Sequence, residues 1–412
     1  MGSKVQVIRK AIQETKQRRK NQKVVVYQLK LQNLSERKQE LLARVFAEAK
    51  WLYNYLVSDI SRLNVPANKI STVQVKVSEA FEQRQLLVLG SQVKQEIADR
   101  LRDNLRALDK LKKKGYNVGT LKPKKFVNSI PLKQYGVTYK LNFACNRVRI
   151  RKLGDFRVLG LHQIPKGAEI ANAVLVRKPS GYYLHVTCYL LKEHFKKEHI
   201  AEAVGIDFGV SNKIILSNGL AIDFELHETR RLKKLQRKLS KAKKGSKNRK
   251  KLQLLLRREY EKIANKRRDA QNKIIAFLKL YNVVIFQDDF IKGWTKNFGK
   301  QVHSSAIGGL KSRLKNSLET PITIDRFEPT SQECYVCGKV HKLSLSDRTM
   351  RCDCGWVCDR DLNAALVILR KGLELSEQYF VGLDRPEVKP LEKGAAARIL
   401  GSNPHIRVSL LQ

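Results

Sequence analysis

Two pairs of closely spaced cysteines stand in the last quarter of the chain. Cys334 and Cys337 are separated by two residues, Cys352 and Cys354 are separated by one, and a polar loop connects the pairs. Two tight turns that each supply two thiolates are what a tetrahedral zinc site needs. Four of the seven cysteines lie within this short stretch, which makes a chance grouping a poor explanation. We therefore predict a structural zinc ribbon over residues 331–357.

The second cysteine pair is one residue shorter than the usual C-x-x-C spacing. A ligand outside the two pairs could therefore complete the site. Cys358 and His341 are close enough in the sequence to replace one of the four cysteines. The sequence leaves the ligand set open between Cys334, Cys337, Cys352 and Cys354 and a set that includes one of these substitutes.

Acidic side chains follow three apolar segments. Asp207 comes after Val-Gly-Ile, Asp288 and Asp289 come just after Val-Val-Ile-Phe, and Asp359 and Asp361 come just after the ribbon. Carboxylates that converge must be neutralised or must bind cations, and Mg²⁺ shares oxygen ligands with substrate phosphates. Two such ions about 3.5–4 Å apart promote phosphodiester cleavage. A single aspartate is as well explained as a helix cap, but three acidic positions together indicate a metal site.

The net charge sets the class of partner. The 412 residues carry a formal charge of +44, which predicts a polyanionic partner, with nucleic acid ahead of a membrane surface. No apolar run approaches the roughly 20 residues of a membrane-spanning helix, and the basic N-terminus lacks the apolar region of a secretory signal. The cysteines suggest no disulfide framework. We expect a cytoplasmic protein, associated with the nucleoid of a prokaryotic cell, and no membrane partner.

The first half of the chain changes pattern twice. Residues 24–31 predict a strand, and 3.6-residue periodicity from Ser35 predicts an amphipathic helix. A second helix is expected over about 86–114. Short alternating runs over about 136–200, separated by glycines and prolines, predict an antiparallel sheet or barrel. The helical residues would then be an insertion after the first barrel strand.

The second half begins with two strands and a basic helical hairpin. Residues 230–273 contain 20 Lys and Arg against 3 Asp and Glu, so we expect the hairpin to bind phosphates. The predicted nucleic-acid-binding residues are Lys233, Lys234, Arg237, Lys241, Lys244, Lys247, Arg249 and Lys250. Residues 281–286 predict a buried strand, and about 303–318 another helix. Glycines and prolines in residues 376–412 lead us to expect a flexible C-terminal tail.

These motifs together resemble the TnpB (OrfB) family of transposon-encoded RNA-guided nucleases and the related compact type V CRISPR effectors. The resemblance rests on the runs GIDFGVSNKIILSNG, LKKLQRKLSKAKKGSKNRKK, FQDDFIKGW, PTSQECYVCG and CDCGWVCDRDLNAA. It implies an α+β multidomain fold with an N-terminal wedge β-barrel, an inserted helical recognition module, and a C-terminal RuvC domain of RNase H-like fold that carries a zinc-ribbon insert. The implied boundaries are 1–34 for the basic arm and first strand, 35–114 for the recognition module, 115–200 for the barrel, 201–330 and 358–375 for the RuvC parts, 331–357 for the ribbon and 376–412 for the tail.

The resemblance also implies an activity. Family members hold a guide RNA, recognise a short motif in double-stranded DNA, open the duplex by guide pairing, and cut both strands at one Mg²⁺-dependent RuvC site. A monomer on its RNA is the expected state. The first and third catalytic acids fall on Asp207 and Asp361, because Asp361 is the second aspartate of the DRDLNAA motif. Asp359 is then a neighbour of the third catalytic acid and not the first choice as a metal ligand.

The second acid departs from the family pattern. Many members have a glutamate directly after the strand, where this chain has Gln287, and others have the acid two residues later, where it has Asp289. Alternate residues of a strand share a face, so Asp289 is the predicted second acid and Asp288 is expected to point away. An aspartate is one methylene shorter than a glutamate. A guide-RNA-dependent DNA-binding repressor with weak or no cleavage is therefore the alternative function, and a DNA-strand-joining transposase is a third.

Overall fold

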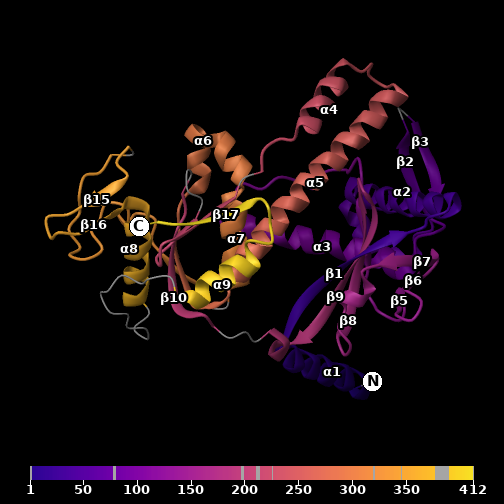
Figure 1. The fold of residues 1–412 in the computed structure, drawn as a ribbon. Helices are drawn as coiled ribbons and strands as arrows, with labels where there is room; N and C mark the ends of the chain where they lie inside the picture. Colours follow the sequence, from indigo (N-terminus) through magenta and orange to yellow (C-terminus); the bar gives the residue numbers. More distant parts are fainter. Residues whose placement is uncertain are drawn as a thin grey trace. The chain divides into compact units, whose positions relative to one another are not determined.

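The computed structural model describes the chain except for residues 1, 78–79, 196–198, 210–213, 225, 319–320, 345, 376–388 and 412. The chain divides into two compact units, residues 1–196 and 197–412. In Figure 1 the first unit runs from indigo to magenta, and the second continues to yellow. Each unit has its own large sheet and its own hydrophobic core. None of the described helices is both long and apolar enough to cross a lipid bilayer.

The first unit is built on a seven-stranded antiparallel sheet with the order β4-β8-β9-β1-β7-β6-β5. Burial alternates along the strands, as in β1, where Leu29 and Leu31 are buried while Val24 and Val26 are exposed. A bridge between residues 135 and 139 lies between the edge strands β4 and β5, and the sheet forms a nearly closed barrel. The strands are β1 (Gln22–Gln32), β4 (Ser129–Leu132), β5 (Tyr139–Asn142), β6 (Arg147–Ile150), β7 (Gly154–Leu159), β8 (Glu169–Lys178) and β9 (Gly181–Leu191).

Two long helices and a strand hairpin lie between β1 and β4 in the sequence. The elements are α2 (Glu36–Ser58), β2 (Thr72–Val77), β3 (Ala80–Gln85) and α3 (Ser91–Lys113), and α1 (Gly2–Lys20) precedes β1. The helix expected from about residue 86 begins at Ser91, because the backbone N–H groups of residues 87–89 are hydrogen-bonded to a side chain of α2. The fully buried carboxylate of Glu48 accepts hydrogen bonds from the N–H groups of Leu87, Val88 and Leu89. This anchor fixes the start of α3 against α2.

The second unit contains a six-stranded mixed sheet with the order β14-β13-β10-β11-β12-β17. Strands β10 (Ala201–Asp207), β11 (Ile214–Leu216) and β12 (Leu220–Phe224) are antiparallel neighbours. Strand β13 (Tyr281–Gln287) runs parallel to β10, and β14 (Pro321–Ile324) runs parallel to β13. Because parallel strands end at the same edge of a sheet, Asp207 and the residues after Gln287 lie at that edge.

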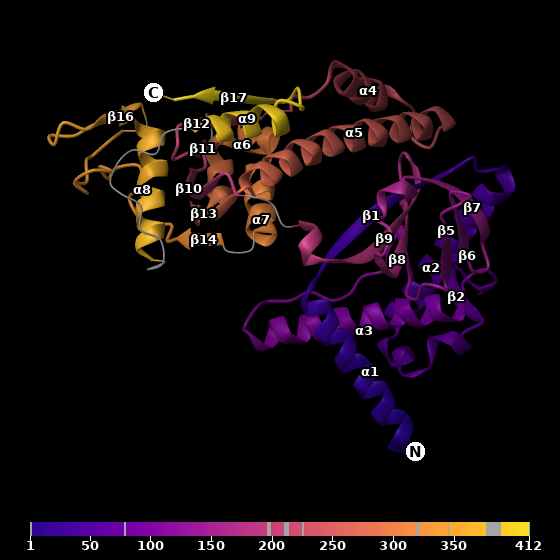
Figure 2. The ribbon, with the colours of Figure 1, turned by 60° about the horizontal axis from the view of Figure 1, so that its bottom comes forward.

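Helices cover both faces of this sheet (Figure 2). One face packs against α5 (Lys247–Leu278), α7 (Ile307–Ser317) and α9 (Pro390–Ile399), and the other packs against α8 (Arg360–Glu374). Helix α8 approaches β10 and β13 closely because both contacts contain glycine. A Cβ added at Gly205 would clash with the α8 backbone at Ala365, and one added at Gly372 would clash with Ile285 on β13.

The expectation of a flexible tail over 376–412 is wrong for its described part. Residues 406–410 form β17 (Ile406–Leu410), which pairs antiparallel with β12 as the outer strand of the sheet. Ala395, Ala396 and Leu400 of the α9 region are buried in the core of the second unit. Residues 376–388 lie outside the described residues. The C-terminal residues therefore complete the fold of the second unit.

Candidate active site

The four cysteines of the two pairs come together at one point. The Sγ atoms of Cys334 and Cys354 are 3.7 Å apart, and those of Cys337 and Cys352 are 3.4 Å apart. Among the described residues, these four form the group of potential metal ligands whose ligand atoms all lie within 4.8 Å of one another. A hydrogen bond from the Lys339 N–H lowers the pKa of the Cys337 thiol to about 7, which favours the thiolate that a metal requires. The cluster is compatible with a structural zinc ion.

The shorter C-x-C pair still brings its two Sγ atoms to the cluster, because the backbone turn at this pair is tighter. After the first pair, the Gly338 N–H donates to the Cys334 carbonyl four residues earlier, and after the second, the Gly355 N–H donates to the Cys352 carbonyl three residues earlier. Both glycines have positive φ, 75° and 89°, which a residue with a Cβ rarely adopts. Each turn therefore presents two Sγ atoms despite the missing residue.

Neither substitute ligand joins the cluster. Cys358 is buried beside Leu362 and Leu366 in a hydrophobic core between α8 and the sheet. It lies on β16 (Val357–Asp359), opposite Met350 of β15 (Thr349–Arg351). His341 is likewise outside the group of four. Of the candidate ligands that the sequence left open, the structure brings together the four cysteines of the two pairs.

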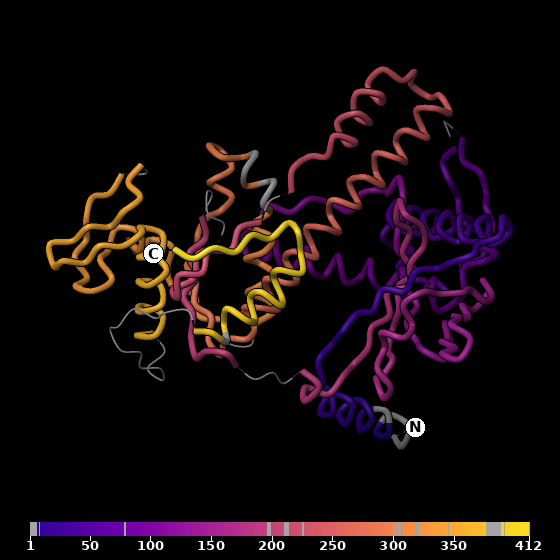
Figure 3. The backbone as a smooth tube through the Cα atoms, viewed as in Figure 1, coloured from indigo at the N-terminus to yellow at the C-terminus, as the bar shows by residue number. Residues whose placement is uncertain are grey.

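The ribbon ends directly in the helix that carries Asp361. Figure 3 traces the chain from β16 into α8. Asp359 caps this helix, since its Oδ1 accepts hydrogen bonds from the N–H groups of Asp361 (2.9 Å) and Leu362 (3.0 Å). Asp361 itself lies in the first turn, where Arg360 contacts its Oδ1 at 3.2 Å. Asp359 is thus a cap, as expected of a neighbour, and Asp361 remains available at the helix start.

Asn363, two residues further on, attaches the ribbon to α8. Its fully buried amide oxygen accepts hydrogen bonds from the Tyr335 N–H (3.1 Å) and the Trp356 indole (3.0 Å). Its amide nitrogen donates to the Glu333 carbonyl at 2.7 Å. Both cysteine turns are therefore linked to one side chain of the helix. Loss of the ribbon structure would displace the start of α8, and with it Asp361.

Asp207 is the last residue of β10, beside the start of α8. Burial, together with the neighbouring carboxylates of Asp361 and Asp289, raises the pKa of Asp207 to about 8. Arg360 and the Phe208 N–H oppose this rise. Asp361 and Asp289 therefore both lie close enough to Asp207 to repel its carboxylate. The three predicted acids are less closely grouped than the cysteines, because they do not form a set within 4.8 Å.

Asp289 follows β13 and is held by a buried lysine. The Lys311 ammonium on α7 lies 3.2 Å from Asp289 Oδ2 and 3.3 Å from the Asp289 carbonyl oxygen. The side chains are 9% and 18% exposed, respectively, so this ion pair is shielded from water. Burial raises the pKa of Asp289 although Lys311 lowers it. No sequence pattern indicates Lys311, which is 22 residues away and lies within a helix.

The two residues before Asp289 point elsewhere. Asp288 is 48% exposed and contacts Arg326 at 3.3 Å, so it turns away from the carboxylate group as expected. The Gln287 side chain is buried, and its Nε2 donates to the carbonyls of Asp325 (2.9 Å) and Glu328 (2.8 Å). The buried Thr330 hydroxyl donates to Gln287 Oε1 at 2.9 Å. Gln287 therefore holds the segment that leads into the ribbon.

The basic hairpin is formed by α4 (Arg230–Lys241) and α5. Leu232 and Leu235 are buried on α4, and the cationic side chains of the hairpin lie on its other faces. Seven of the eight predicted nucleic-acid-binding residues are exposed: Lys233, Lys234, Arg237, Lys241, Lys244, Lys247 and Lys250. Arg249 differs, because its guanidinium donates to the carbonyls of Leu239 and Ala242, both at 2.8 Å, and closes the turn of the hairpin.

Two regions of the chain match the models of known protein families. A Cas12f1-like TNB domain matches residues 310–368, which include the ribbon and the start of α8. A family described as a probable transposase, OrfB, matches residues 186–281. The resemblance to the TnpB (OrfB) family is confirmed. The two matched regions contain Asp207, Asp361, all four cysteines of the cluster and the basic hairpin.

Curated relatives of the TnpB type align with about half of the chain. A putative RNA-guided DNA endonuclease from Streptomyces pristinaespiralis is 34% identical over 225 residues, 52% of this chain and 56% of that protein. The putative RNA-guided DNA endonuclease InsQ from Escherichia coli is 26% identical over 270 residues, 58% of this chain and 65% of that protein. The chain thus spans less than two thirds of either relative. The structure of a Cas12f1–sgRNA–target DNA complex covers 81% of this chain and 83% of its own, with 13% identity and a TM-score of 0.41.

Proposed function

We propose that this protein is an RNA-guided, Mg²⁺-dependent double-stranded DNA endonuclease with a single RuvC-type site. The observation that carries the proposal is the meeting of Asp207, Asp289 and Asp361, from three separate segments, at one edge of a mixed sheet. A group of carboxylates is unexpected in a chain with a net charge of +44, and a specific role such as metal binding explains it. The relatives named as RNA-guided DNA endonucleases support the same activity.

The strand order supports an RNase H-like fold for the second unit. Three antiparallel strands are followed by two strands that run parallel to the first and lie on its other side, giving the order β14-β13-β10-β11-β12. The acids lie at the ends of β10 and β13 and at the start of the helix that packs on both strands. We assign 201–330 and 358–375 to the RuvC parts and 331–357 to the ribbon.

The carboxylates fit a divalent cation. Burial and the neighbouring carboxylates of Asp361 and Asp289 raise the pKa of Asp207, and an oxygen-seeking cation would relieve this repulsion. Asp207, Asp289 and Asp361 would hold Mg²⁺, as two ions in the full site. When bound, Mg²⁺ supplies an activated water and charge stabilisation for the departing oxygen of a phosphodiester.

The residues around the acids would orient them. Lys311 holds the Asp289 carboxylate by its ammonium group, and Arg360 does the same for Asp361. The zinc ribbon and Asn363 fix the start of α8. The exposed lysines of α4 and α5 would bind nucleic-acid phosphates and bring the backbone to the unit that carries the acids.

The first unit would hold the guide RNA and assist in recognising target DNA. We assign residues 1–34 and 115–200 to the wedge barrel with its preceding arm, and 35–114 to the recognition module. The expected partners are a guide RNA and a double-stranded DNA target, bound by a monomer in the prokaryotic cytoplasm at the nucleoid.

One observation favours a second candidate, a guided repressor with little cleavage. Gln287 stands where many family members have an acid, and the shorter Asp289 is paired with Lys311. If Lys311 does not release Asp289, the site would lack one metal ligand. DNA binding would then persist without cleavage.

The deciding experiment starts from the RNA that co-purifies with the protein. Sequencing this RNA gives the guide, and a DNA library that contains the matching target then reports cleavage in Mg²⁺. Defined RNA with cleavage supports the nuclease, and defined RNA with binding but no cleavage supports the repressor. The absence of any defined RNA would contradict both candidates.

A further inference from the structure

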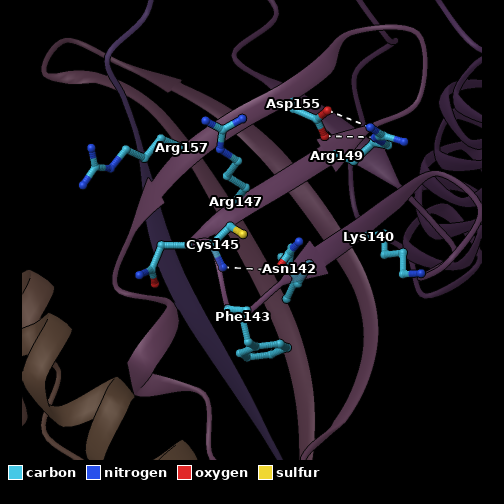
Figure 4. A pocket seen from close by; sticks show the side chains of 11 residues that line it. Lys140, Asn142, Phe143, Cys145, Arg147, Arg149, Asp155 and Arg157 are labelled. Carbon is cyan, nitrogen blue, oxygen red and sulfur yellow. Dashed lines mark hydrogen bonds and ion pairs between the residues drawn. The ribbon is translucent and has the colours of Figure 1, made fainter.

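The outer face of β5, β6 and β7 in the first unit forms a cationic hollow of about 840 Å³ (Figure 4). Strands β5 and β6 are joined by a turn at residues 143–146, which forms part of the wall. All lining residues of the hollow belong to the first unit, whereas the carboxylates belong to the second. Its lining residues include Lys140, Asn142, Phe143, Cys145, Arg147, Arg149, Asp155 and Arg157.

Two arginines of the hollow stand directly opposite each other. Arg147 on β6 and Arg157 on β7 are register partners in the antiparallel pair, and like charges in this arrangement destabilise a sheet. Within the described part of the chain, neither guanidinium makes a direct hydrogen bond or ion pair, although the charge of Arg147 helps to lower the pKa of Asp155. The next pair on the same face of these strands is different, because Arg149 is neutralised by Asp155 through hydrogen bonds of 2.9 and 2.8 Å. Arg147 and Arg157 are therefore available to bind an anion.

An aromatic ring lies beside these charges. Phe143 is 47% exposed, although burial of a phenylalanine is favourable. The turn that presents it is fixed: the Cys145 N–H donates to Asn142 Oδ1 at 3.2 Å, and the Val158 N–H donates to the Asn146 carbonyl at 2.9 Å. An exposed ring held by a fixed turn, in the same hollow as two arginines without a direct partner, is the combination that binds single-stranded nucleic acid, where bases stack and phosphates pair with cations.

We propose that this hollow is a binding site for an unpaired nucleotide and its flanking phosphates. Phe143 stacks on the base, and Arg147 and Arg157 bind the phosphates. A base-paired nucleotide does not offer its face for stacking, so the site discriminates single strands from duplexes. The site is independent of the carboxylates and of the proposed cleavage, and its test requires no catalysis.

Cys145 provides a local reporter, because its exposed thiol lines the hollow. The full-length protein, freed of nucleic acid, is mixed with an eight-nucleotide single-stranded RNA, the same sequence as DNA, or an eight-base-pair duplex. Fluorescence anisotropy establishes saturation. Alkylation of Cys145 by iodoacetamide is then followed by peptide mass spectrometry. We expect a saturating single strand to slow alkylation at least fivefold and the duplex to slow it less than twofold. The RNA and DNA arms show which strand the site prefers.

Variants of the lining residues test whether the proposed contacts cause the protection of Cys145 from alkylation. Arg147→Gln with Arg157→Gln should abolish protection, and Phe143→Ala, which keeps every charge, should reduce it at least threefold. Lys112→Gln with Lys125→Gln removes two exposed charges elsewhere in the same unit and should leave protection unchanged. Unprotected Cys145 at saturation, equal protection by duplex, or equal loss of protection in the control variant would each overturn the proposal.

Discussion

The substitution Gln287→Glu separates two accounts of the position after β13. If Gln287 occupied a vacant catalytic position, a glutamate there would restore the family pattern and increase cleavage. The structure predicts damage instead, because the Gln287 Nε2 donates to two carbonyl oxygens, those of Asp325 and Glu328. A carboxylate would remove both donors and place negative charge against two acceptors.

The size of the effect follows from these contacts. The two hydrogen bonds are partly buried, and Asp325 is itself exposed. Each such bond contributes about 0.5–1.5 kcal/mol net, so losing both corresponds to roughly 1–3 kcal/mol in the second unit. One kcal/mol lowers the midpoint of unfolding by about 2–4 °C in a unit of this size. The midpoint of Gln287→Glu should therefore fall by roughly 2–12 °C at pH 7.5.

Thermal unfolding of the parent, Gln287→Glu and Gln287→Met measures this effect. Gln287→Met removes the same hydrogen bonds without adding charge and should be the milder change at pH 7.5. Protonation removes the charge of the introduced carboxyl, so the difference between the two variants should shrink as the pH falls towards 5. A Gln287→Glu protein that unfolds like the parent and cuts faster would refute the structural role of Gln287.

Three further predictions concern other parts of the second unit. Cys337→Ser should lose zinc in elemental analysis and reduce cleavage more than RNA binding, whereas Cys358→Ser should keep its zinc. Asp207→Asn should raise the unfolding midpoint in EDTA at pH 8. Burial and neighbouring acids raise the Asp207 pKa to about 8. The stability that this carboxyl contributes is therefore present below about pH 4 and is lost as the pH rises towards 8. A parent protein whose unfolding midpoint equals that of the variant at both pH 5 and pH 8 would contradict this. The double change Lys234→Gln and Arg237→Gln should lower the log–log salt slope of RNA affinity by roughly 1–2, and an unchanged slope would exclude these residues from the contact.

The fold was largely predictable where local patterns decide it. Alternating apolar residues predicted the barrel strands. The spacing of the cysteines predicted that both pairs come together, including the short second pair, while their role as zinc ligands stays a prediction. The DRDLNAA run marked Asp361, and its neighbours now have physical roles: Asp359 caps α8, and Asn363 joins that helix to the ribbon. Each of these features depends on residues close in the sequence or on a repeated spacing.

Other features depend on distant partners and could not be predicted. Residues 406–410 become a strand because β12, far earlier in the chain, offers an edge. The β2–β3 hairpin is largely polar, so its alternation carried little signal. Lys311 looked like one of many surface lysines until the fold buried it against Asp289. Gln287 looked like a lost acid, but its partners lie 38–43 residues later.

The central claim is tested most directly by a cleavage time course on one guide-matched DNA target in Mg²⁺. The parent is compared with Asp289→Asn and with Asp288→Asn, a matched control that removes the adjacent, exposed carboxylate paired with Arg326. We expect Asp289→Asn to retain guided DNA binding and to lose cleavage by at least 100-fold, while Asp288→Asn cuts within about twofold of the parent. Cleavage by Asp289→Asn at the parental rate would exclude Asp289 from the catalytic group.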